Sequence, residues 1–239
     1  MLKTKVASFF TLADVYSVLC GDPYCTQCGD FGPLLWLPEC TRCCTTCLRQ
    51  APDLLPITQH AATKALGVPK SALTHLPTVC TVPGDYGTPN KIHTARRQYL
   101  SFQYARAVAV ERAGGEAQCM ARISASTQRQ AAYDAFMCAD TNLRGHIGRY
   151  MVTAPLPYFD KHSGKADRGI YCAGCRNVVR RFNGTNTSWE QHHEDIRRQD
   201  TVYLTSDFIQ HIQRDCPDGQ LIWECHSKLS KRKTKSRRR

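Results

Sequence analysis

Six cysteines lie within the 23 residues from Cys25 to Cys47, in a chain of 239 residues that has 14 cysteines in all. Such a density of sulfur can serve disulfide crosslinks, thiol catalysis or metal binding. Catalytic dithiols usually occur as one pair in a thioredoxin-like setting. Pairs of the type CxxC that recur in an intracellular chain most often hold zinc. The repeated pairs of this chain therefore favour metal binding.

Disulfides would require an oxidising compartment, and the first 20 residues do not indicate export. Lys3 and Lys5 precede an apolar run, but Asp14 interrupts it and no small-residue cleavage site follows. No segment approaches the ~20 apolar residues of a membrane span. We therefore expect an intracellular protein in the nucleus or cytoplasm, with the sequons at Asn183 and Asn186 as plain polar loop residues. An amphipathic helix is predicted instead from apolar residues at helical spacing: Phe9, Leu12, Val15, Tyr16 and Leu19.

The first predicted zinc site combines the pair Cys25 and Cys28 with the pair Cys44 and Cys47. Fifteen residues separate the two pairs, which is within the range for a four-cysteine zinc site. Two residues between cysteines let a tight turn bring both sulfurs to one ion, and Gly29 follows the first pair where a turn can need a positive φ. We expect the second pair at a helix start, after a short buried strand "PLLWL".

Cys40 and Cys43 form a competing pair, only eleven residues after Cys28. The spacing favours Cys44 and Cys47, with Cys40 and Cys43 as a buried thiol and a spare one. The spacing alone does not decide whether Cys40 or Cys43 replaces Cys44 as a ligand.

The second predicted zinc site consists of Cys172, Cys175, His211 and Cys216. Ser206 is the expected N-cap of a short helix that carries His211, and Cys216 follows near the helix end at Pro217. A helical histidine and a cysteine just beyond the helix can converge on one ion with the CxxC pair, giving a Cys3His set. Other candidate ligands for this site remain: His192, His193, Cys225 and His226.

Both predicted sites have four protein ligands, which is typical of structural zinc. We therefore predict an α+β protein, mainly helical with few short strands, braced by two structural Zn²⁺ ions. The expected organisation is a zinc module with a turn-rich connection over 1–90, a helical region with the second module over 91–226, and a disordered basic tail over 227–239. Helices are expected from Thr94 to Gly114 and over 117–139, with Cys119 and Cys138 as small buried residues. The segments "HSGKADRG" and "NGTNTS" are expected to be exposed loops.

The last twelve residues, "KLSKRKTKSRRR", supply eight of the chain's twelve formal net positive charges and contain no acid. The basic character is therefore mostly a property of the tail. Such a block favours nuclear import or a weak, non-specific grip on nucleic acid. A nuclear nucleic-acid-binding zinc protein is accordingly the alternative function.

Four stretches in this order resemble the region after the F-box in fungal F-box proteins: Cys25-x2-Cys28-Gly with Phe31, "LPECTRCCTTCL", "LGVPKSALTHLPTVCTVPGDYG", and "YCAGC" with the later "FIQHIQRDC". The resemblance implies the same eight ligands and a role as a substrate-recognition subunit of a cullin-type ubiquitin ligase. In that family a helical F-box that binds the ligase adaptor would precede Phe9, whereas only eight residues precede it here. We therefore expect no adaptor binding by this chain as given, unless an F-box lies upstream.

The leading functional prediction is thus a non-catalytic, zinc-stabilised protein-interaction module with an unknown protein target. The sequence contains no nucleotide-binding Gly-rich loop, no Gly-x-Ser-x-Gly elbow and no HExxH. The metal also accounts for most of the reactive side chains, so an enzyme is not expected.

Overall fold

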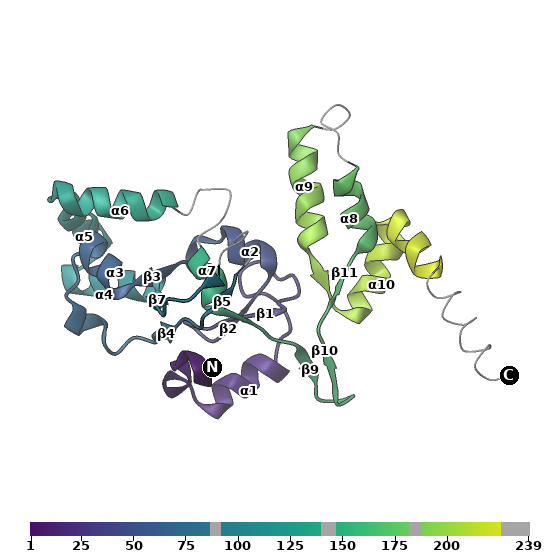
Figure 1. The fold of residues 1–239 in the computed structure, drawn as a ribbon, viewed down its shortest axis with the longest axis horizontal. Coiled ribbons are helices and arrows are strands. Elements are labelled where there is room, and N and C mark those ends of the chain that lie inside the picture. Colours follow the sequence, from purple (N-terminus) through teal and green to yellow (C-terminus); the bar gives the residue numbers. More distant parts are fainter. Residues whose placement is uncertain (87–91, 140–146, 182–187, 226–239) are drawn as a thin grey trace.

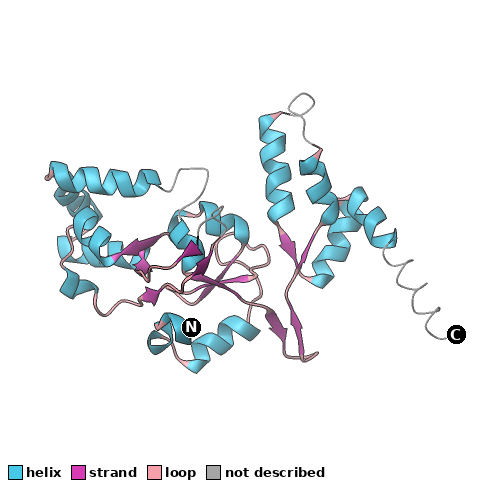
Figure 2. Cartoon of the chain, in the orientation of Figure 1, coloured by secondary structure: helices cyan, strands magenta, loops and turns pink. Residues whose placement is uncertain are grey.

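The computed structural model describes residues 1–86, 92–139, 147–181 and 188–225, and shows an α+β protein with short antiparallel strands (Figures 1 and 2). The described α-helices are α1 (Leu12–Cys20), α2 (Thr45–Gln50), α3 (Gln59–Leu66), α4 (Phe102–Ala113), α5 (Glu116–Ser124), α6 (Thr127–Ala139), α7 (Ile147–Met151), α8 (Ala173–Arg180), α9 (Trp189–Asp200) and α10 (Thr205–Arg214), followed by a helical segment over 217–225. The 3-10 helices are η1 (Leu2–Thr4), η2 (Val6–Phe9), η3 (Pro52–Leu54) and η4 (Lys70–Leu73). The strands are β1 (Leu34–Trp36), β2 (Thr41–Cys43), β3 (Pro56–Thr58), β4 (Val79–Cys80), β5 (Gly84–Asp85), β6 (Ile92–His93), β7 (Gln98–Ser101), β8 (Thr153–Pro155), β9 (Tyr158–Asp160), β10 (Lys165–Asp167), β11 (Ile170–Tyr171) and β12 (Val202–Tyr203).

The first core surrounds the sheet β2–β1–β8, in which Leu34 pairs with Cys43 on one side and Pro155 on the other. The predicted strand in "PLLWL" is confirmed as β1, whose Trp36 is fully buried. Strand β8 lies more than a hundred residues later in the chain. Residues on both sides of residue 90 therefore build this core.

The second core lies between the sheet β3–β7–β4 and helices α3–α6. The predicted helix from Thr94 to Gly114 is wrong in its first part, because Gln98–Ser101 forms the central strand β7. There Leu100 is fully buried and pairs with Ile57 of β3. Helix α4 begins only at Phe102, where the Ser101 side chain caps it by accepting from the Tyr104 N–H.

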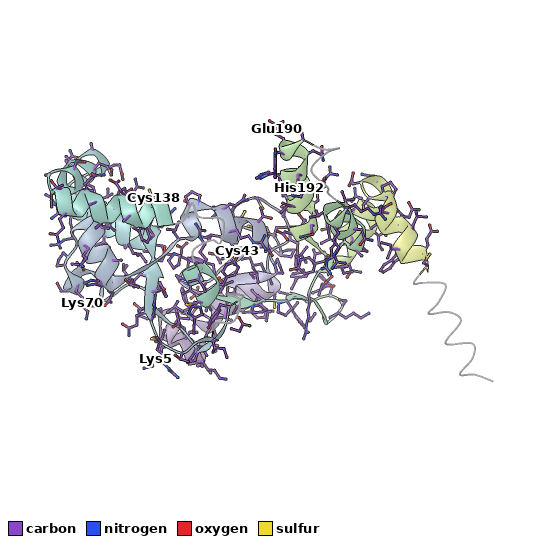
Figure 3. The ribbon with its side chains drawn as sticks, turned by 45° about the horizontal axis from the view of Figure 1, so that its top comes forward. Lys5, Cys43, Lys70, Cys138, Glu190 and His192 are labelled. Atoms are coloured by element: carbon purple, nitrogen blue, oxygen red, sulfur yellow. The ribbon has the colours of Figure 1, made fainter. Side chains whose placement is uncertain are left out.

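The predicted helix over 117–139 is two helices, α5 and α6, which are separated at Ala125 and Ser126. Cys119 is buried in the second core as expected, but Cys138 is exposed, which corrects the prediction (Figure 3). Tyr133, Phe136 and Met137 of α6 pack against the second core, and the helical period places Cys138 on another face of that helix.

The predicted amphipathic helix is present as α1, preceded by η2. Asp14 has a local role: it accepts from the Thr11 N–H at 2.7 Å while Thr11 Oγ1 accepts from the Asp14 N–H at 3.2 Å, a capping box. The apolar stripe is only partly covered, since Leu12 is 89% and Tyr16 56% exposed.

A buried arginine holds this N-terminal helix to the first core. Arg42 of β2 is 2% exposed and donates five hydrogen bonds to backbone carbonyls. The acceptors belong to three separate segments: Val18 and Leu19 at the end of α1, Gly32 before β1, and Leu156 and Pro157 after β8. Burial lowers the pKa of Arg42, and the carbonyls at the end of α1 carry the negative end of the helix dipole, which stabilises the cation.

Glu39 links the two cores, because its carboxylate accepts a hydrogen bond from Ser101 Oγ at 2.5 Å. Burial raises the pKa of Glu39, and the bond from Ser101 opposes that rise. Because the pKa of Glu39 is raised in the folded state, the folded protein binds more protons than the unfolded chain between the two pKa values. The contribution of Glu39 to the stability of the fold is therefore greatest below its ordinary pKa of 4.5 and is lost as the pH rises through the folded-state pKa.

We therefore expect Glu39→Gln to unfold less readily than the wild type at pH 8, with the difference shrinking towards pH 4. Urea unfolding of both proteins across this pH range measures the difference between their free energies of unfolding. The protonation of other groups affects both proteins equally and cancels in this difference. Glu111→Gln on the exposed face of α4 is the control and should track the wild type. A difference that does not vary with pH would contradict the assignment.

The C-terminal part of the described chain follows the hairpin β9–β10 and is built from β11–β12, α8, α9 and α10 (Figure 1). The hairpin corrects the prediction that "HSGKADRG" is only a loop, because Lys165–Asp167 pairs with Tyr158–Asp160. Helix α10 begins at Thr205 with Leu204 as N-cap, so Ser206 is not the cap. Instead Asp167 accepts from the Thr205 N–H at 3.0 Å, which ties the hairpin to α10.

Two predictions lie outside the described residues. The sequons at Asn183 and Asn186, in "NGTNTS", and the tail over 227–239 fall there. Within the described ranges, every helix is too short or too polar to pass through a membrane.

Candidate metal centres

The first predicted ligand set comes together at the edge of the first core. Cys25 and Cys28 lie on a turn before β1, where Gly29 has a φ of 81° as expected. Cys44 is the N-cap of α2 and Cys47 lies in its first turn, which confirms the helix predicted at the second pair. The hairpin β1–β2 carries the second pair back to the first. The sulfur atoms of all four ligands of this set lie within 4.8 Å of one another: Cys25, Cys28, Cys44 and Cys47.

Backbone N–H groups point at these sulfurs and stabilise negative charge on them. The Gln27 N–H lies 3.4 Å from Cys25 Sγ, and the Cys47 N–H lies 3.3 Å from Cys44 Sγ. A hydrogen bond from Cys44 lowers the pKa of Cys25 to about 5. The pKa of Cys44 is raised in return, and burial raises that of Cys47 to about 12. Burial and the hydrogen bond that Cys44 gives to Cys25 thus raise the pKa of the other three thiols, and a divalent ion at their centre would let all four ionise.

Cys40 and Cys43 do not join the described cluster. Cys43 ends β2 with its side chain fully buried in the first core, and burial raises its pKa. Cys40 lies in the β1–β2 turn with a φ of 52° and is also buried. The structure therefore favours Cys44 over either of them as the ligand, in line with the spacing.

The second predicted ligand set comes together from three segments. Cys172 precedes α8 as its N-cap and Cys175 lies in its first turn. His211 lies in α10, and Cys216 follows that helix by two residues. All four side chains are buried, and their ligand atoms lie within 4.8 Å of one another. The long gap between Cys175 and His211 is spanned by α9, which lies beside α8 (Figure 1).

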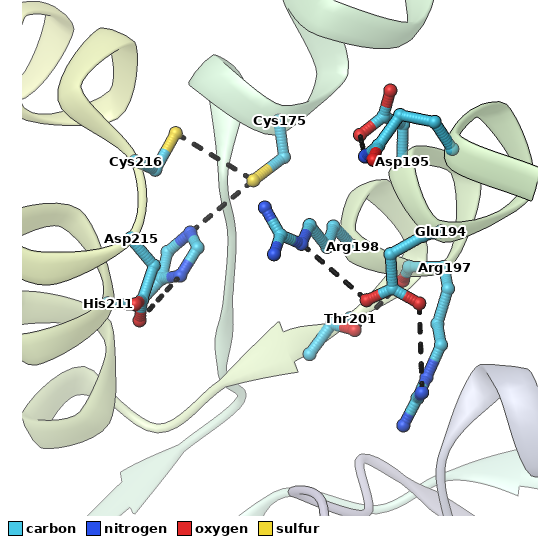
Figure 4. A network of polar contacts seen from close by, with 10 residues as sticks. Cys175, Glu194, Asp195, Arg197, Arg198, Thr201, His211, Asp215 and Cys216 are labelled. Carbon is cyan, nitrogen blue, oxygen red and sulfur yellow. Dashed lines mark hydrogen bonds and ion pairs between the residues drawn. The ribbon is translucent and has the colours of Figure 1, made fainter. Parts of the chain in front are cut away.

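Figure 4 shows Cys175 between Cys216 and His211. Its Sγ lies 3.8 Å from Cys216 Sγ and 3.4 Å from His211 Nε2, while Cys172 Sγ lies 3.7 Å from Cys216 Sγ. In the first set, Cys28 Sγ lies 3.6 Å from Cys44 Sγ. Tetrahedral zinc with Zn–S bonds of ~2.3 Å and Zn–N bonds of ~2.0 Å separates two sulfurs by about 3.8 Å and sulfur from nitrogen by about 3.5 Å. Each set can therefore hold one zinc ion with little movement.

The other candidate ligands lie elsewhere in the described chain. His192 (labelled in Figure 3) and His193 belong to α9 and take no part in the cluster. Cys225 is exposed at the end of the helical segment over 217–225. His226 lies outside the described residues. Among the described candidates, His211 is the histidine that completes the set.

Two residues that the sequence analysis missed orient His211. The ring of Tyr203 stacks on the imidazole with centroids 4.3 Å apart and 14° between the planes. Asp215 Oδ2 lies 3.9 Å from His211 Nδ1, so the carboxylate faces the nitrogen that points away from the cysteines. A carboxylate behind a ligand histidine is a common second layer of zinc sites. The i, i+4 spacing of His211 and Asp215 on one helix was the available signal.

Two glycines also shape the second set. A Cβ added at Gly174 would lie 2.3 Å from the Gly219 nitrogen and 2.7 Å from Cys216 Sγ. A Cβ at Gly219 would lie 2.9 Å from Cys172 Sγ. Only glycine at these positions allows the start of α8 to approach the segment after Cys216.

We expect Gly174→Ala to weaken zinc binding at the second set by at least tenfold, because the new methyl group meets backbone that cannot move independently. Competition with a zinc-binding dye measures this loss. Ala173→Ser, at the neighbouring exposed position of the same helix, is the control and should retain the wild-type affinity. Equal affinities for Gly174→Ala and the wild type would contradict the close packing described here.

A comparison with protein-family models, with curated proteins and with solved structures found no match to this chain.

Proposed function

We propose that the chain is a non-catalytic protein-interaction module whose shape depends on two zinc ions. The observation that carries this is the pair of four-residue ligand sets, each made of a CxxC pair and ligands from another part of the chain. Four protein ligands complete the usual coordination of zinc, so the ion would brace the fold and leave no position for a substrate. Zinc would be held by Cys25, Cys28, Cys44 and Cys47 in one set, and by Cys172, Cys175, His211 and Cys216 in the other.

Exposed apolar side chains support an interaction role. Leu12 and Tyr16 on α1 and Trp189 on α9 are 89%, 56% and 71% exposed. Large apolar side chains at the surface of a soluble domain are often parts of protein-binding surfaces. We propose further that the partner is a protein selected for ubiquitin transfer, as the resemblance to the region downstream of the F-box implies. Recognition of a target would then be the task of this chain.

Affinity capture with the full chain as bait tests the proposal in extracts of its own cells. We expect one or more proteins to be retained in stoichiometric amount after nuclease treatment and a wash at 0.5 M salt. The bait Cys28→Ser, which lacks one predicted ligand, should lose them, whereas Cys225→Ser should keep them. Material that is retained only before nuclease treatment would contradict the proposal and favour nucleic-acid binding.

A further inference from the structure

A groove away from both metal centres is lined by cationic and hydrogen-bonding side chains and by no carboxylate. Its volume is about 540 Å³. Figure 3 shows Lys70 on the side of the molecule opposite the C-terminal helices. The lining residues that matter here are Gln59, His60, Thr63, Lys70, Arg97 and Gln98.

The two cations of the groove, Lys70 and Arg97, and the His60 imidazole come from three different parts of the fold. His60 lies in the first turn of α3, Lys70 begins η4, and Arg97 immediately precedes β7. The backbone of Arg97 is fixed, because its N–H donates to Thr81 Oγ1 at 2.8 Å and its carbonyl accepts from the Thr81 N–H at 2.8 Å. The pairing of Thr58 in β3 with Tyr99 in β7 places the start of α3 beside the segment with Arg97. The fold therefore gathers these groups from distant parts of the chain.

The side chains of His60, Lys70 and Arg97 form no ion pair or hydrogen bond with another described residue. Several other arginines do, such as Arg49 with Asp200 and Arg181 with Asp218. Lysine and arginine side chains that face one groove repel each other unless an anion lies between them. Their lack of a carboxylate partner leaves the groove free to bind an external anion.

Backbone donors add to this charge. The first N–H groups of α3 have no partner within the helix, and the Thr58 side chain satisfies only the N–H of Ala61, at 3.1 Å. The register of β3 and β7 uses the Gln59 N–H in the strand ladder, opposite Gln98. The N–H of His60 in the first turn of α3 has no partner within the helix, and it lies at the positive end of the helix dipole beside the groove. Lysine, arginine and helix N–H groups together are the donors that phosphate groups select.

We propose that this groove binds a phosphate monoester, presented as a phosphorylated serine or threonine side chain of a protein partner. The proposal rests on the interaction role proposed above and names the chemistry of the partner. The lining contains no Phe, Tyr or Trp side chain, the large aromatic rings on which nucleobases stack most strongly. The groove is larger than one phosphate group, and Gln98 and Thr63 offer hydrogen bonds to the peptide on either side of it.

The test is a titration of ¹⁵N-labelled, zinc-loaded full chain with a tetrapeptide that contains phosphoserine. We expect the largest amide shifts at Gln59, His60 and Gln98. Lys70→Gln and Arg97→Gln should each weaken binding about tenfold, because each removes a charged hydrogen-bond donor. Lys64 lies in α3, the helix of His60, but outside the lining of the groove. Lys64→Gln is therefore the matched control and should bind the peptide as the wild type does.

Three results would overturn the proposal. The peptide with unmodified serine could bind equally well, inorganic phosphate could match the phosphopeptide in affinity, or a single-stranded oligonucleotide could bind these residues more tightly. Failure of the proposed interaction role can be told apart from failure of the phosphate site. In the first case the full chain would still bind the phosphopeptide but would retain no protein in the affinity capture described above. If the full chain retains protein partners but does not bind the phosphopeptide, only the proposal that the groove binds phosphate is overturned.

Discussion

Replacing Cys175 with serine is expected to unfold the C-terminal region over residues 170–216 while the two N-terminal cores stay folded. Five residues form the buried cluster of that region, and three of them are the predicted ligands Cys172, Cys175 and Cys216. The others, Phe208 and Ile212, contribute about 1.5–3 kcal/mol each by burial. Structural zinc contributes about 10–16 kcal/mol in small zinc domains at pH 7. The metal therefore outweighs the apolar core here.

Elemental analysis and hydrogen exchange measure this result together. The wild type should contain two zinc ions per chain and the Cys175→Ser protein one. Fast exchange should appear in α8 and α10 but not in β1 or β7. Cys225→Ser is the control, since this exposed cysteine lies outside the ligand set. Two ions in the Cys175→Ser protein, or none in the wild type, would disprove the metal centres.

Replacing Arg42 with methionine is expected to destabilise the first core by about 3–5 kcal/mol. Methionine fills a similar volume but leaves five backbone carbonyls without the donor they now share. Those carbonyls belong to three segments, so the loss would separate α1 and the segment after β8 from the sheet. Urea unfolding followed by the fluorescence of the buried Trp36 measures the change.

Arg42→Lys separates charge from geometry. Lysine keeps the positive charge but has only three donors, all on one nitrogen. It therefore cannot donate to the five carbonyls that surround the planar guanidinium group of Arg42. We expect it to recover less than half of the lost stability. Arg112→Met, at an exposed position of α4, should change stability by no more than about 0.5 kcal/mol. Full recovery by lysine would show that charge alone matters at this position.

The features of this protein that can be predicted from its sequence are those in which the chemistry acts between residues close together in the chain. CxxC pairs are local, because two intervening residues are enough to direct both sulfurs to one point. Helix capping is local in the same sense, because the Thr11–Asp14 capping box involves residues only three positions apart. The choice among distant ligands was harder, and the structure brings His211 rather than His192 or His193 to the cysteines.

The errors in secondary structure have a common cause. Residues 98–101 were predicted as helix because Leu100 falls on the apolar face that continues into α4. In the structure this segment is a strand between β3 and β4, and such pairing brings together residues that local periodicity does not connect. The same holds for β10, whose sequence Lys165–Asp167 is polar and becomes a strand only by pairing with β9.

By itself, the sequence determined the α+β class, the strand β1, the helix of α1, the helix start at α2, and the CxxC pairs suited to zinc. These follow from spacing and from side-chain chemistry within a few residues. Only the tertiary structure decided the central strand β7, the five bonds of Arg42, the Tyr203 and Asp215 contacts to His211, and the groove with Lys70 and Arg97. Each of these depends on distances between segments that lie far apart in the chain, and no local pattern encodes such distances.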